Sequence, residues 1–239
     1  MLITIVIPAY NEEKRITPTL KSIVSYFSDK KILHEIIVSD DGSSDNTVKI
    51  VTDLKTSYPQ ISVFSLNQNF GKGKAVREGM LRGKGDYILF MDADSSTSIE
   101  EFEKFIPLIY QSKDILIGTR KSKGARIVEH QPFLREFFGK GFAWFSNIIT
   151  GAHVSDFTCG FKCFSRKAVN DIFKKAFIDD WSFDAEILFL ARRMGYEIIE
   201  VPVVWKNDRA TKVRLVRDIL HSLRGLVRIR RYALKGSYR

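Results

Sequence analysis

The first hundred residues alternate between apolar runs of the strand type and segments with the apolar spacing of amphipathic helices. Runs rich in β-branched and aromatic residues predict strands, and apolar positions three and four residues apart predict helices between them. This order predicts βαβ units and a mainly parallel sheet flanked by helices. The predicted strands cover residues 2–7, 35–39, 61–66 and 87–91, and the predicted helices cover residues 16–27, 48–54 and 75–82.

The pattern becomes less regular after residue 94. It predicts a loop at 121–131, strands at 114–118 and 197–205, and helices at 99–111, 133–149, 165–174, 183–194 and 211–234. We therefore expect one α/β domain over residues 1–210, followed by a basic amphipathic helix at 211–239. The helix at 133–149 is rich in aromatic residues, which is typical both of a membrane interface and of a buried core helix.

Positive charge is concentrated at the C-terminal end of the chain. Residues 209–239 contain ten Lys and Arg and one acidic residue, Asp218, so they supply +9 of the formal net charge of +10. This distribution argues against a protein that binds nucleic acid over its whole surface. It predicts that one cationic segment contacts an anionic surface such as membrane phosphates, with RNA as the alternative.

No segment has the pattern of a secretory signal or a membrane span. The chain opens with a strand-like run, and its longest uncharged apolar stretch, residues 141–155, is 15 residues long. A spanning helix needs about 18 or more. The only cysteines, Cys159 and Cys163, lack further Cys or His at zinc-finger spacing. We expect a cytoplasmic protein that is peripheral at the cytoplasmic face of a membrane.

Acidic residues follow three of the predicted strands. Glu12 lies after the first strand, Asp40 and Asp41 follow the second, and Asp92 and Asp94 follow the fourth. Ligands of an open parallel sheet bind beyond the carboxyl ends of its strands, so we expect these side chains to meet at one edge. Because like charges repel, a cation or a hydrogen-bonding ligand is expected among them.

Asp92 and Asp94 form an Asp-x-Asp pair that suits Mg²⁺ or Mn²⁺. Carboxylate oxygens are the hard ligands that these ions prefer, and the remaining coordination positions would be left for phosphate oxygens. The alternative is that the pair caps the following helix. The pair alone does not separate the two interpretations.

Two glycine-containing turns have similar alternatives. In Asp40-Asp41-Gly42, one carboxylate could accept hydrogen bonds from a base or ribose, but Asp-Gly is also a common turn. The segment from Asn67 to Lys74, which contains Gly71-Lys72-Gly73, loosely resembles a phosphate-binding loop without the spacing of known phosphate motifs. A tight turn that opens a helix at Ala75 explains it equally well.

Taken together, these segments resemble family-2 glycosyltransferases of the GT-A fold. The matching order and spacing run through residues 6–13, 38–47, 71–73 and 92–94. Residues 118–120, 156–162, 181–186 and 211–213 resemble the polyprenyl-phosphate branch, nearest the dolichyl-phosphate β-glucosyltransferases. The likeness implies a Rossmann-like catalytic domain at 1–210, with a nucleotide-binding half at about 1–95 and an acceptor half at about 96–210.

The resemblance implies an inverting transfer of a hexose, expected to be glucose from UDP-glucose, onto a polyprenyl phosphate of the dolichyl type. Related mannosyl-transferring enzymes often have Gln two residues beyond the second Asp, where this chain has Ser96. A GDP-mannose donor is therefore the second interpretation. Many relatives carry membrane anchors, so a membrane-protein partner is a further expectation, whereas nucleic acid is not expected as a partner.

The resemblance also implies roles for individual residues. The divalent metal, Mg²⁺ or Mn²⁺, would be held by Asp92 and Asp94, and the acceptor phosphate by Arg120 and Arg135. Lys212 would contact the diphosphate when the C-terminal segment closes. The full nucleotide-binding set is Pro8, Ala9, Tyr10, Glu12, Asp40, Asp41, Lys72, Asp92 and Lys212, and the catalytic set is Asp92, Asp94, Arg120, Asp156 and Asp184.

A phosphate acceptor changes what the acidic residues need to do. Its oxygen would attack the anomeric carbon while the metal and nearby cations stabilise the departing nucleoside diphosphate. A phosphate is already ionised near neutral pH, so no strong base is required. We therefore favour positioning roles for Asp156 and Asp184 over base catalysis, which a hydroxyl acceptor would demand.

Two other functions remain as alternatives. A Mg²⁺-dependent phosphohydrolase would use Asp-x-Asp as nucleophile and acid, but such enzymes place the pair after the first strand, and here three predicted strands precede it. A basic nucleotide- or RNA-binding module would explain the charged tail and leave the acidic strand ends unexplained.

Overall fold

The computed structural model describes residues 1–129, 133–206 and 215–238, without the side chains of 133–140, 142 and 215–223. A seven-stranded sheet of order β3-β2-β1-β4-β7-β5-β8 crosses the molecule. All neighbours in it are parallel except β7, which is antiparallel to both β4 and β5. The strands are β1 (Leu2–Ala9), β2 (Leu33–Asp40), β3 (Ile61–Ser65), β4 (Tyr87–Met91), β5 (Ile115–Thr119), β7 (Phe161–Ser165) and β8 (Ile198–Pro202).

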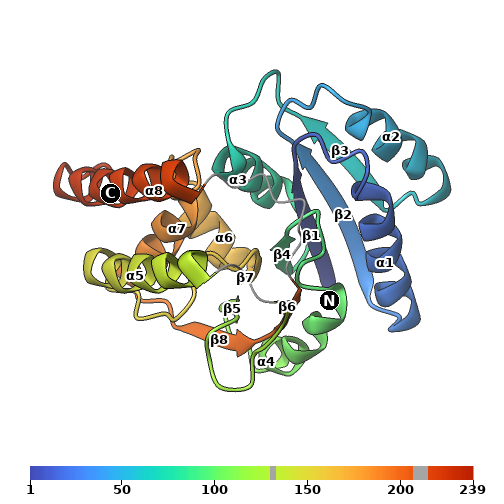
Figure 1. The fold of residues 1–239 in the computed structure, drawn as a ribbon. Helices are drawn as coiled ribbons and strands as arrows, with labels where there is room; N and C mark the ends of the chain where they lie inside the picture. Colours follow the sequence, from blue (N-terminus) through green and yellow to red (C-terminus); the bar gives the residue numbers. More distant parts are fainter. Residues whose placement is uncertain (130–132, 207–214, 239) are drawn as a thin grey trace.

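Helices cover both faces of this sheet (Figure 1). Two buried apolar clusters, one on each face, form the core. The prediction of a mostly parallel sheet flanked by helices is therefore confirmed. The helices are α1 (Ile16–Asp29), α2 (Thr47–Ser57), α3 (Lys72–Arg82), the 3₁₀ helix η1 (Ile99–Lys104), α4 (Ile106–Tyr110), α5 (Phe133–Thr150), α6 (Arg166–Phe173), α7 (Phe183–Arg193) and α8 (Leu215–Leu234).

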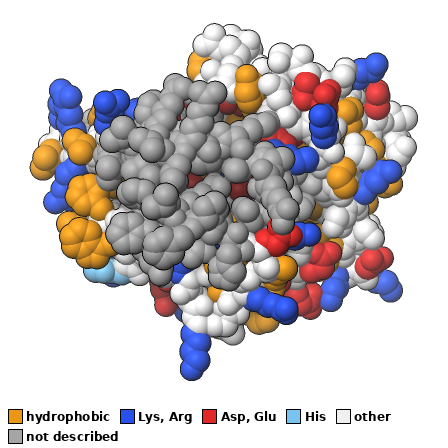
Figure 2. Space-filling view, in the orientation of Figure 1, with side chains coloured by type: hydrophobic (Ala, Val, Ile, Leu, Met, Phe, Trp, Pro, Cys, Tyr) orange, Lys and Arg blue, Asp and Glu red, His pale blue; other side chains and the backbone are white. Residues whose placement is uncertain are grey.

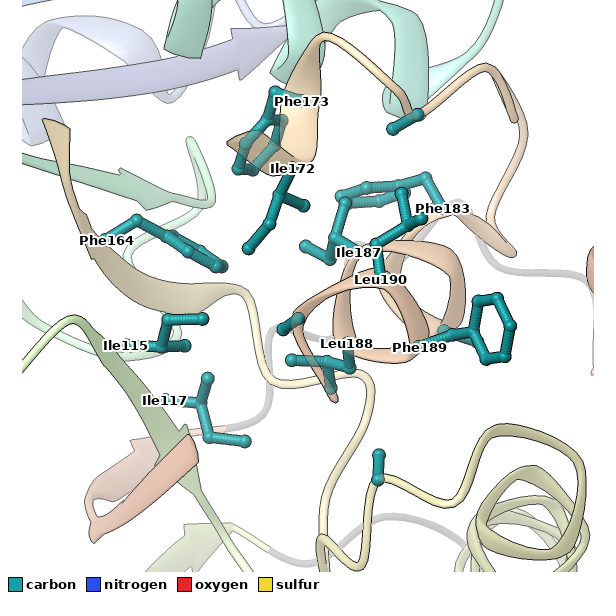
Figure 3. Packing of buried hydrophobic residues seen from close by; sticks show 14 of the residues in the cluster. Ile115, Ile117, Phe164, Ile172, Phe173, Phe183, Ile187, Leu188, Phe189 and Leu190 are labelled. Atoms are coloured by element: carbon teal, nitrogen blue, oxygen red, sulfur yellow. The ribbon is translucent and has the colours of Figure 1, made fainter. Parts of the chain in front are cut away.

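Helix α1 illustrates how the apolar pattern sets the packing. Ile16, Leu20, Ile23 and Phe27 recur at spacings of three and four residues and are fully buried on one face of the sheet. Burial of each such side chain contributes about 1.5–3 kcal/mol. On the other face, α7 packs against β5, β7 and α6 in the cluster drawn in Figure 3. The helices packed on the two faces of the sheet therefore hold the ends of the strands in place.

The structure differs from the predicted elements mainly in the second half. Strand β7 has no counterpart in the prediction, and the predicted loop at 121–131 contains β6 (Arg126–Glu129), which pairs with β9 (Val204–Lys206). The strand predicted at 197–205 is divided into β8 and β9, and the helix predicted at 99–111 into η1 and α4. The short strands are each fixed by pairing with a distant segment, which local periodicity does not record. The predicted helix is divided just before Pro107, which lies in the first turn of α4.

The C-terminal helix α8 packs against α5 and α7. Leu226 and Ile229 of this helix are fully buried in the core cluster. None of the described helices combines the length and the apolar character needed to cross a bilayer. Residues 211–214 of the predicted tail lie outside the described residues.

Candidate functional site

The carboxyl ends of three neighbouring parallel strands meet at one edge of the sheet. Strand β1 lies between β2 and β4, and Ala9 stands opposite Asp40 in the β1–β2 register. The Asp41 amide donates to the Ala9 carbonyl oxygen at 2.8 Å. Ala9, the last residue of β1, is therefore the direct neighbour of Asp40, which ends β2, and of Asp41, which follows it.

The chain after β1 is held against the start of α2. The Glu12 amide donates to Thr47 Oγ1 at 2.8 Å, and the Glu12 carboxylate accepts two hydrogen bonds from Arg15, at 2.6 and 2.7 Å. Tyr10, between strand and loop, is 39% exposed. These contacts fix the loop that carries two of the predicted nucleotide-binding residues.

Asp40 and Asp41 are almost fully buried, and their carboxylates organise two loops. Asp40 accepts hydrogen bonds from the amide of Ser43, at 3.1 Å, and from its hydroxyl. Asp41 accepts from the amides of Phe70, at 2.9 Å, and Gly71, at 2.8 Å. Burial raises the pKa of Asp41, and the two amide donors oppose this rise. Asp40 thus forms the turn that the sequence allowed, while Asp41 keeps acceptor positions for a further donor.

Lys72 connects this acidic turn to the Asp-x-Asp pair. Helix α3 begins immediately after Gly71, and the Lys72 ammonium binds Asp92 Oδ1 at 2.5 Å. Burial disfavours the ammonium, but the surrounding carboxylates, Asp92 and Asp184 foremost, outweigh burial and raise the pKa of Lys72. Helix α3 begins three residues before Ala75, where the sequence predicts it to open, and the phosphate-binding interpretation of this segment stays a prediction.

Asp92 and Asp94 do not cap the following helix. Asp94 accepts the Ser96 amide at 2.9 Å within a local turn, whereas η1 begins after Ser98 and has no side-chain cap. The capping alternative is therefore wrong. Burial, with the negative charge of Asp92, raises the pKa of Asp94. A divalent cation would reverse that effect, because it favours the ionised form of both groups.

A second lysine lies next to this pair and is completely buried. Lys162 of β7 donates to Asp184 Oδ1 at 2.5 Å and to the Cys159 carbonyl oxygen at 2.6 Å. Burial raises the pKa of Asp184, and Lys162 and Lys72 oppose the rise. The predicted catalytic residue Asp184 is thus held from the first turn of α7 by a buried cation.

Arg120 and Asp156 form a bidentate ion pair. Arg120 Nε and Nη2 donate to the two carboxylate oxygens at 2.6 and 2.7 Å, and Nη2 also donates to Thr158 Oγ1 at 2.9 Å. Asp156 is fully buried, and although burial alone would raise its pKa, Arg120 holds that pKa well below the usual range. Asp156 is consequently a poor proton acceptor and a firm support for the guanidinium.

Glu200 of β8 holds the turn that carries Asp156 through three hydrogen bonds. Its Oε1 accepts the Ser155 amide at 2.8 Å, the Ser155 hydroxyl at 2.7 Å and the Asp156 amide at 3.3 Å. The Ser155 hydroxyl also lies 2.7 Å from Thr119 Oγ1. The turn that carries Asp156 is therefore tied to two strands.

The structure does not describe the side chains of two residues of the prediction. Lys212 falls in residues 207–214, which lie outside the described residues, and Arg135 belongs to α5 but its side chain is not described.

The sequence analysis gave no role to three residues that help to form the site, Lys162, Gly160 and Glu200. A lysine inside the apolar run Phe161–Ser165 was the one available signal, since a charged side chain within a buried strand demands a partner. Glu200 sits in a strand pattern that gives no such signal.

Residues 4–173 match the glycosyl transferase family 2. The chain belongs to that family. It is 39% identical to a dolichyl-phosphate beta-glucosyltransferase of Trichomonas vaginalis over 89% of this chain and 66% of that protein. Proteins of the same description from Dictyostelium discoideum and Saccharomyces cerevisiae are each 34% identical, over 97% and 100% of this chain and 75% and 77% of theirs.

Solved structures with this fold support the GT-A architecture of this glycosyltransferase. The mannosyl-3-phosphoglycerate synthase of Rubrobacter xylanophilus aligns with a TM-score of 0.71 at 16% identity, covering 99% of this chain and 75% of that one. Glucosyl-3-phosphoglycerate synthase of Mycobacterium tuberculosis, solved with Mn²⁺, UDP and glucosyl-3-phosphoglycerate, aligns at 0.67 and 18% identity, covering 95% and 79%. Membership of this family excludes the two alternative functions, the Mg²⁺-dependent phosphohydrolase and the basic nucleotide- or RNA-binding module.

The side chains of this glycosyltransferase fit a divalent metal at Asp92 and Asp94. The pair supplies two hard oxygen ligands and leaves positions for phosphate oxygens and water. Gly160 leaves the space that the Asp92 carboxylate fills, since a Cβ there would overlap all three of its terminal atoms. Within residues 1–129, 133–206 and 215–238, no group of three or more His, Cys, Asp or Glu side chains has the arrangement of a metal site. M. tuberculosis glucosyl-3-phosphoglycerate synthase is also solved with Mg²⁺ and UDP.

Proposed function

We propose that this glycosyltransferase transfers glucose from UDP-glucose to the phosphate of a dolichyl-type polyprenyl phosphate, with inversion at the anomeric carbon. The observation that carries the proposal is the similarity to dolichyl-phosphate beta-glucosyltransferases, at 29–39% identity over 89–100% of this chain. That similarity extends through the half of the chain that contains Arg120 and Asp156, which is the half where an acceptor would bind.

In the proposal the nucleotide lies along the ends of β1 and β2. Pro8, Ala9, Tyr10 and Glu12 line one side, and Asp41 offers a carboxylate to the base or ribose. Asp92 and Asp94 hold Mg²⁺ or Mn²⁺, which when bound neutralises charge on the departing diphosphate. Lys72, already 2.5 Å from Asp92, adds a second positive charge beside the diphosphate. With Ser96 in place of Gln, we favour a uridine nucleotide over GDP-mannose.

Arg120 is the proposed contact for the acceptor phosphate. Asp156 binds its Nε and Nη2 and so fixes the plane of the guanidinium, which leaves Nη1 for an incoming phosphate. The lowered pKa of Asp156 makes this residue unsuitable as a base, in agreement with an acceptor that is ionised already. Asp156 and Asp184 are accordingly positioning residues in the proposal, each held by a cation. Arg135 and Lys212 complete the set as additional phosphate contacts.

The lipid acceptor places the site at a membrane surface, and we assign peripheral attachment at the cytoplasmic face to α5 and α8. Trp144 and Ile148 of α5 are 68% and 61% exposed, and Val227 and Leu234 of α8 are 59% and 81% exposed. Figure 2 shows hydrophobic side chains beside Lys and Arg on the part of the surface that these two helices occupy. Apolar side chains flanked by basic ones are suited to the interface of an anionic bilayer.

The proposal is tested by the dependence of UDP release on the acceptor. With UDP-glucose and Mn²⁺, addition of dolichyl phosphate should accelerate UDP release at least about tenfold, whereas dolichol, which has a hydroxyl in place of the phosphate, should not. Equal stimulation by dolichol would overturn the assignment of a phosphate nucleophile. Faster turnover of GDP-mannose than of UDP-glucose would overturn the assignment of the donor.

A further inference from the structure

The loop between α6 and α7, residues 177–182, is in direct backbone contact with the first turn of α3. The Asp179 carbonyl oxygen accepts the Gly73 amide at 2.8 Å and the Lys74 amide at 3.3 Å. A Cβ at Gly71 would lie 2.5 Å from the same carbonyl oxygen. Arg77, one turn further along α3, donates to Asp179 Oδ1 at 2.7 Å. The position of this loop therefore sets the position of the helix turn that carries Lys72.

The same loop also contacts the Lys72 side chain. The ammonium lies 5.5 Å from the ring centroid of Trp181 and 6.0 Å from that of Phe183, which follows the loop. Cations are attracted to the faces of aromatic rings at such distances. Lys72 thus contacts both Asp92 and the aromatic rings of the loop region.

Helix α8 and the turn after it hold the loop from its opposite side. Gly225 of α8 packs directly on Ser182, so closely that a Cβ at position 225 would overlap the Ser182 Oγ and Cβ atoms. Arg228 Nη1 donates to Asp180 Oδ2 at 2.7 Å. Ser182 is the N-cap residue of α7 but makes no side-chain cap bond, and its buried hydroxyl has no hydrogen-bond partner within the described residues. The seam between α8 and the loop therefore depends on close packing rather than on bonds of Ser182.

A buried carboxylate joins the start of the loop to the end of the described chain. Glu186 of α7 is fully buried, and its Oε2 accepts the amides of Phe177, at 3.1 Å, and Ile178, at 2.8 Å. Its Oε1 accepts the Tyr238 hydroxyl at 2.8 Å. The Tyr238 ring stacks on Phe177 with centroids 4.8 Å apart. Both ends of the loop are consequently fixed by residues of the C-terminal segment.

From this continuous set of contacts we infer that docking of α8 on the 177–182 loop positions Lys72 and thereby sets the affinity of the enzyme for the nucleoside diphosphate. Gly225, Arg228 and Tyr238 are then positioning residues that act on the donor site without touching the donor. The inference rests on the proposed function, because it assigns the donor diphosphate to Lys72. It further implies that a displacement of α8, which carries part of the proposed membrane surface, changes donor affinity.

The test uses a clash and its relief. Gly225→Ala forces α8 away from Ser182, and Ser182→Gly removes both atoms that the new methyl group would overlap. We expect Gly225→Ala to weaken the binding of UDP in the presence of Mn²⁺ about tenfold, as measured by titration calorimetry. Ser182→Gly should stay within about twofold of the wild type, and the double variant should return to that range. Gly141→Ala is the matched control, since it adds the same methyl group to helix α5 where nothing lies within 4 Å.

A loss of folding is separated from a loss of positioning by measuring thermal unfolding on the same samples. If Gly225→Ala lowers the unfolding temperature while UDP affinity at 20 °C below that temperature is unchanged, the seam is structural only and the inference is wrong. If the double variant has the unfolding temperature of the wild type but still binds UDP weakly, Lys72 is not positioned through this seam and the inference is also wrong. A wild-type chain that binds no UDP with Mn²⁺ would instead refute the proposed donor site itself.

Discussion

Two lysines lie among three carboxylates where the predicted metal pair is close to the first turn of α7. Lys72 binds Asp92, and Lys162 binds Asp184, while Asp94 has the protonated form favoured by burial and by the charge of Asp92. Each ion pair lowers the cost of keeping a carboxylate ionised away from water. Asp92 and Asp184 thus each have a lysine partner, and a divalent cation would supply the positive charge that favours ionised Asp94.

Removing Lys162 should reveal how much of the stability depends on this compensation. Lys162→Met leaves Asp184 buried without its cation, and we expect a loss of about 3–5 kcal/mol in the free energy of unfolding, measured with denaturant. The double variant with Asp184→Asn should recover part of that loss, because no charge remains buried. Lys84→Met, at an exposed lysine, should change stability by less than about 0.5 kcal/mol. A loss equal to that of Lys84→Met would show that the Lys162–Asp184 pair contributes nothing.

The Arg120–Asp156 pair should appear in the dependence of stability on pH. Asp156 has a depressed pKa in the folded protein, so it contributes stability above its unfolded pKa, which is about 3.9, and loses that contribution as the pH falls toward the folded value. Asp156→Asn should therefore be less stable than the wild type at pH 7, and the difference should shrink below about pH 4. A difference that stays constant between pH 7 and pH 3 would mean that the carboxylate is not held ionised by Arg120.

At the scale of elements, the site depends on β7, the one antiparallel strand of the main sheet. Its insertion between β4 and β5 places Gly160 against Asp92 and Lys162 against Asp184. The strands and helices of the first hundred residues could be predicted because each strand is a mainly apolar, β-rich run and each helix has apolar residues at helical spacing. Strand β7 could not, because its five residues include a lysine whose burial depends on an aspartate 22 residues away.

The same limit explains which parts of the candidate site could be predicted. Asp92, Asp41 and Pro8 sit at strand ends, so the topology rule for parallel sheets was enough to bring them together. The residues that hold the site in place could not be predicted in this way. Glu200, which accepts a hydrogen bond from the Asp156 amide, comes from a strand distant in sequence, and its position gives no periodic signal. The cap alternative for Asp92 and Asp94 likewise depends on where the next helix begins, and the structure places that start at Ile99, beyond the reach of both side chains as caps.

Gly160 offers a test of the contact between β4 and the start of β7. Gly160→Ala would place a methyl group on the Asp92 carboxylate, so the carboxylate must move. We expect affinity for Mn²⁺ together with UDP to fall by about 10- to 100-fold, because losing the groups that orient a metal ligand commonly costs that much affinity. Gly141→Ala again serves as the control, with no expected change. Undiminished binding in Gly160→Ala would show that Asp92 does not need its present position to hold the metal.

At the scale of the whole molecule, the sheet that carries the site lies between two sets of helices, and one of these sets carries the proposed membrane surface. Helices α5 and α8 lie at one side of the sheet, and α1 and α2 lie at the other (Figure 1). Deleting the tail would expose the core around Leu226 and Ile229, which are fully buried. Substitutions of exposed charges are therefore the better test of membrane binding.

Exposed arginines of α8 should contribute to membrane binding, and matched lysines elsewhere should not. The triple variant Arg224→Gln, Arg230→Gln, Arg231→Gln should bind vesicles containing anionic lipid at least about tenfold more weakly at moderate salt, measured by sedimentation. The control removes the same charge from α1 and α2 through Lys21→Gln, Lys49→Gln, Lys55→Gln, and it should leave binding nearly unchanged. Equal losses in both variants would indicate attraction by net charge alone, without an oriented surface.

The central claim is that the metal site at Asp92 and Asp94 transfers glucose to a lipid phosphate, and the product tests it most directly. UDP-glucose labelled in the sugar should be incubated with dolichyl phosphate and Mn²⁺, and the lipid fraction extracted and analysed by NMR. We expect labelled dolichyl phosphate glucose in the β configuration from the wild-type chain and at least about 10³-fold less from Asp94→Ala. Free glucose without any labelled lipid, or an undiminished yield from Asp94→Ala, would contradict the account.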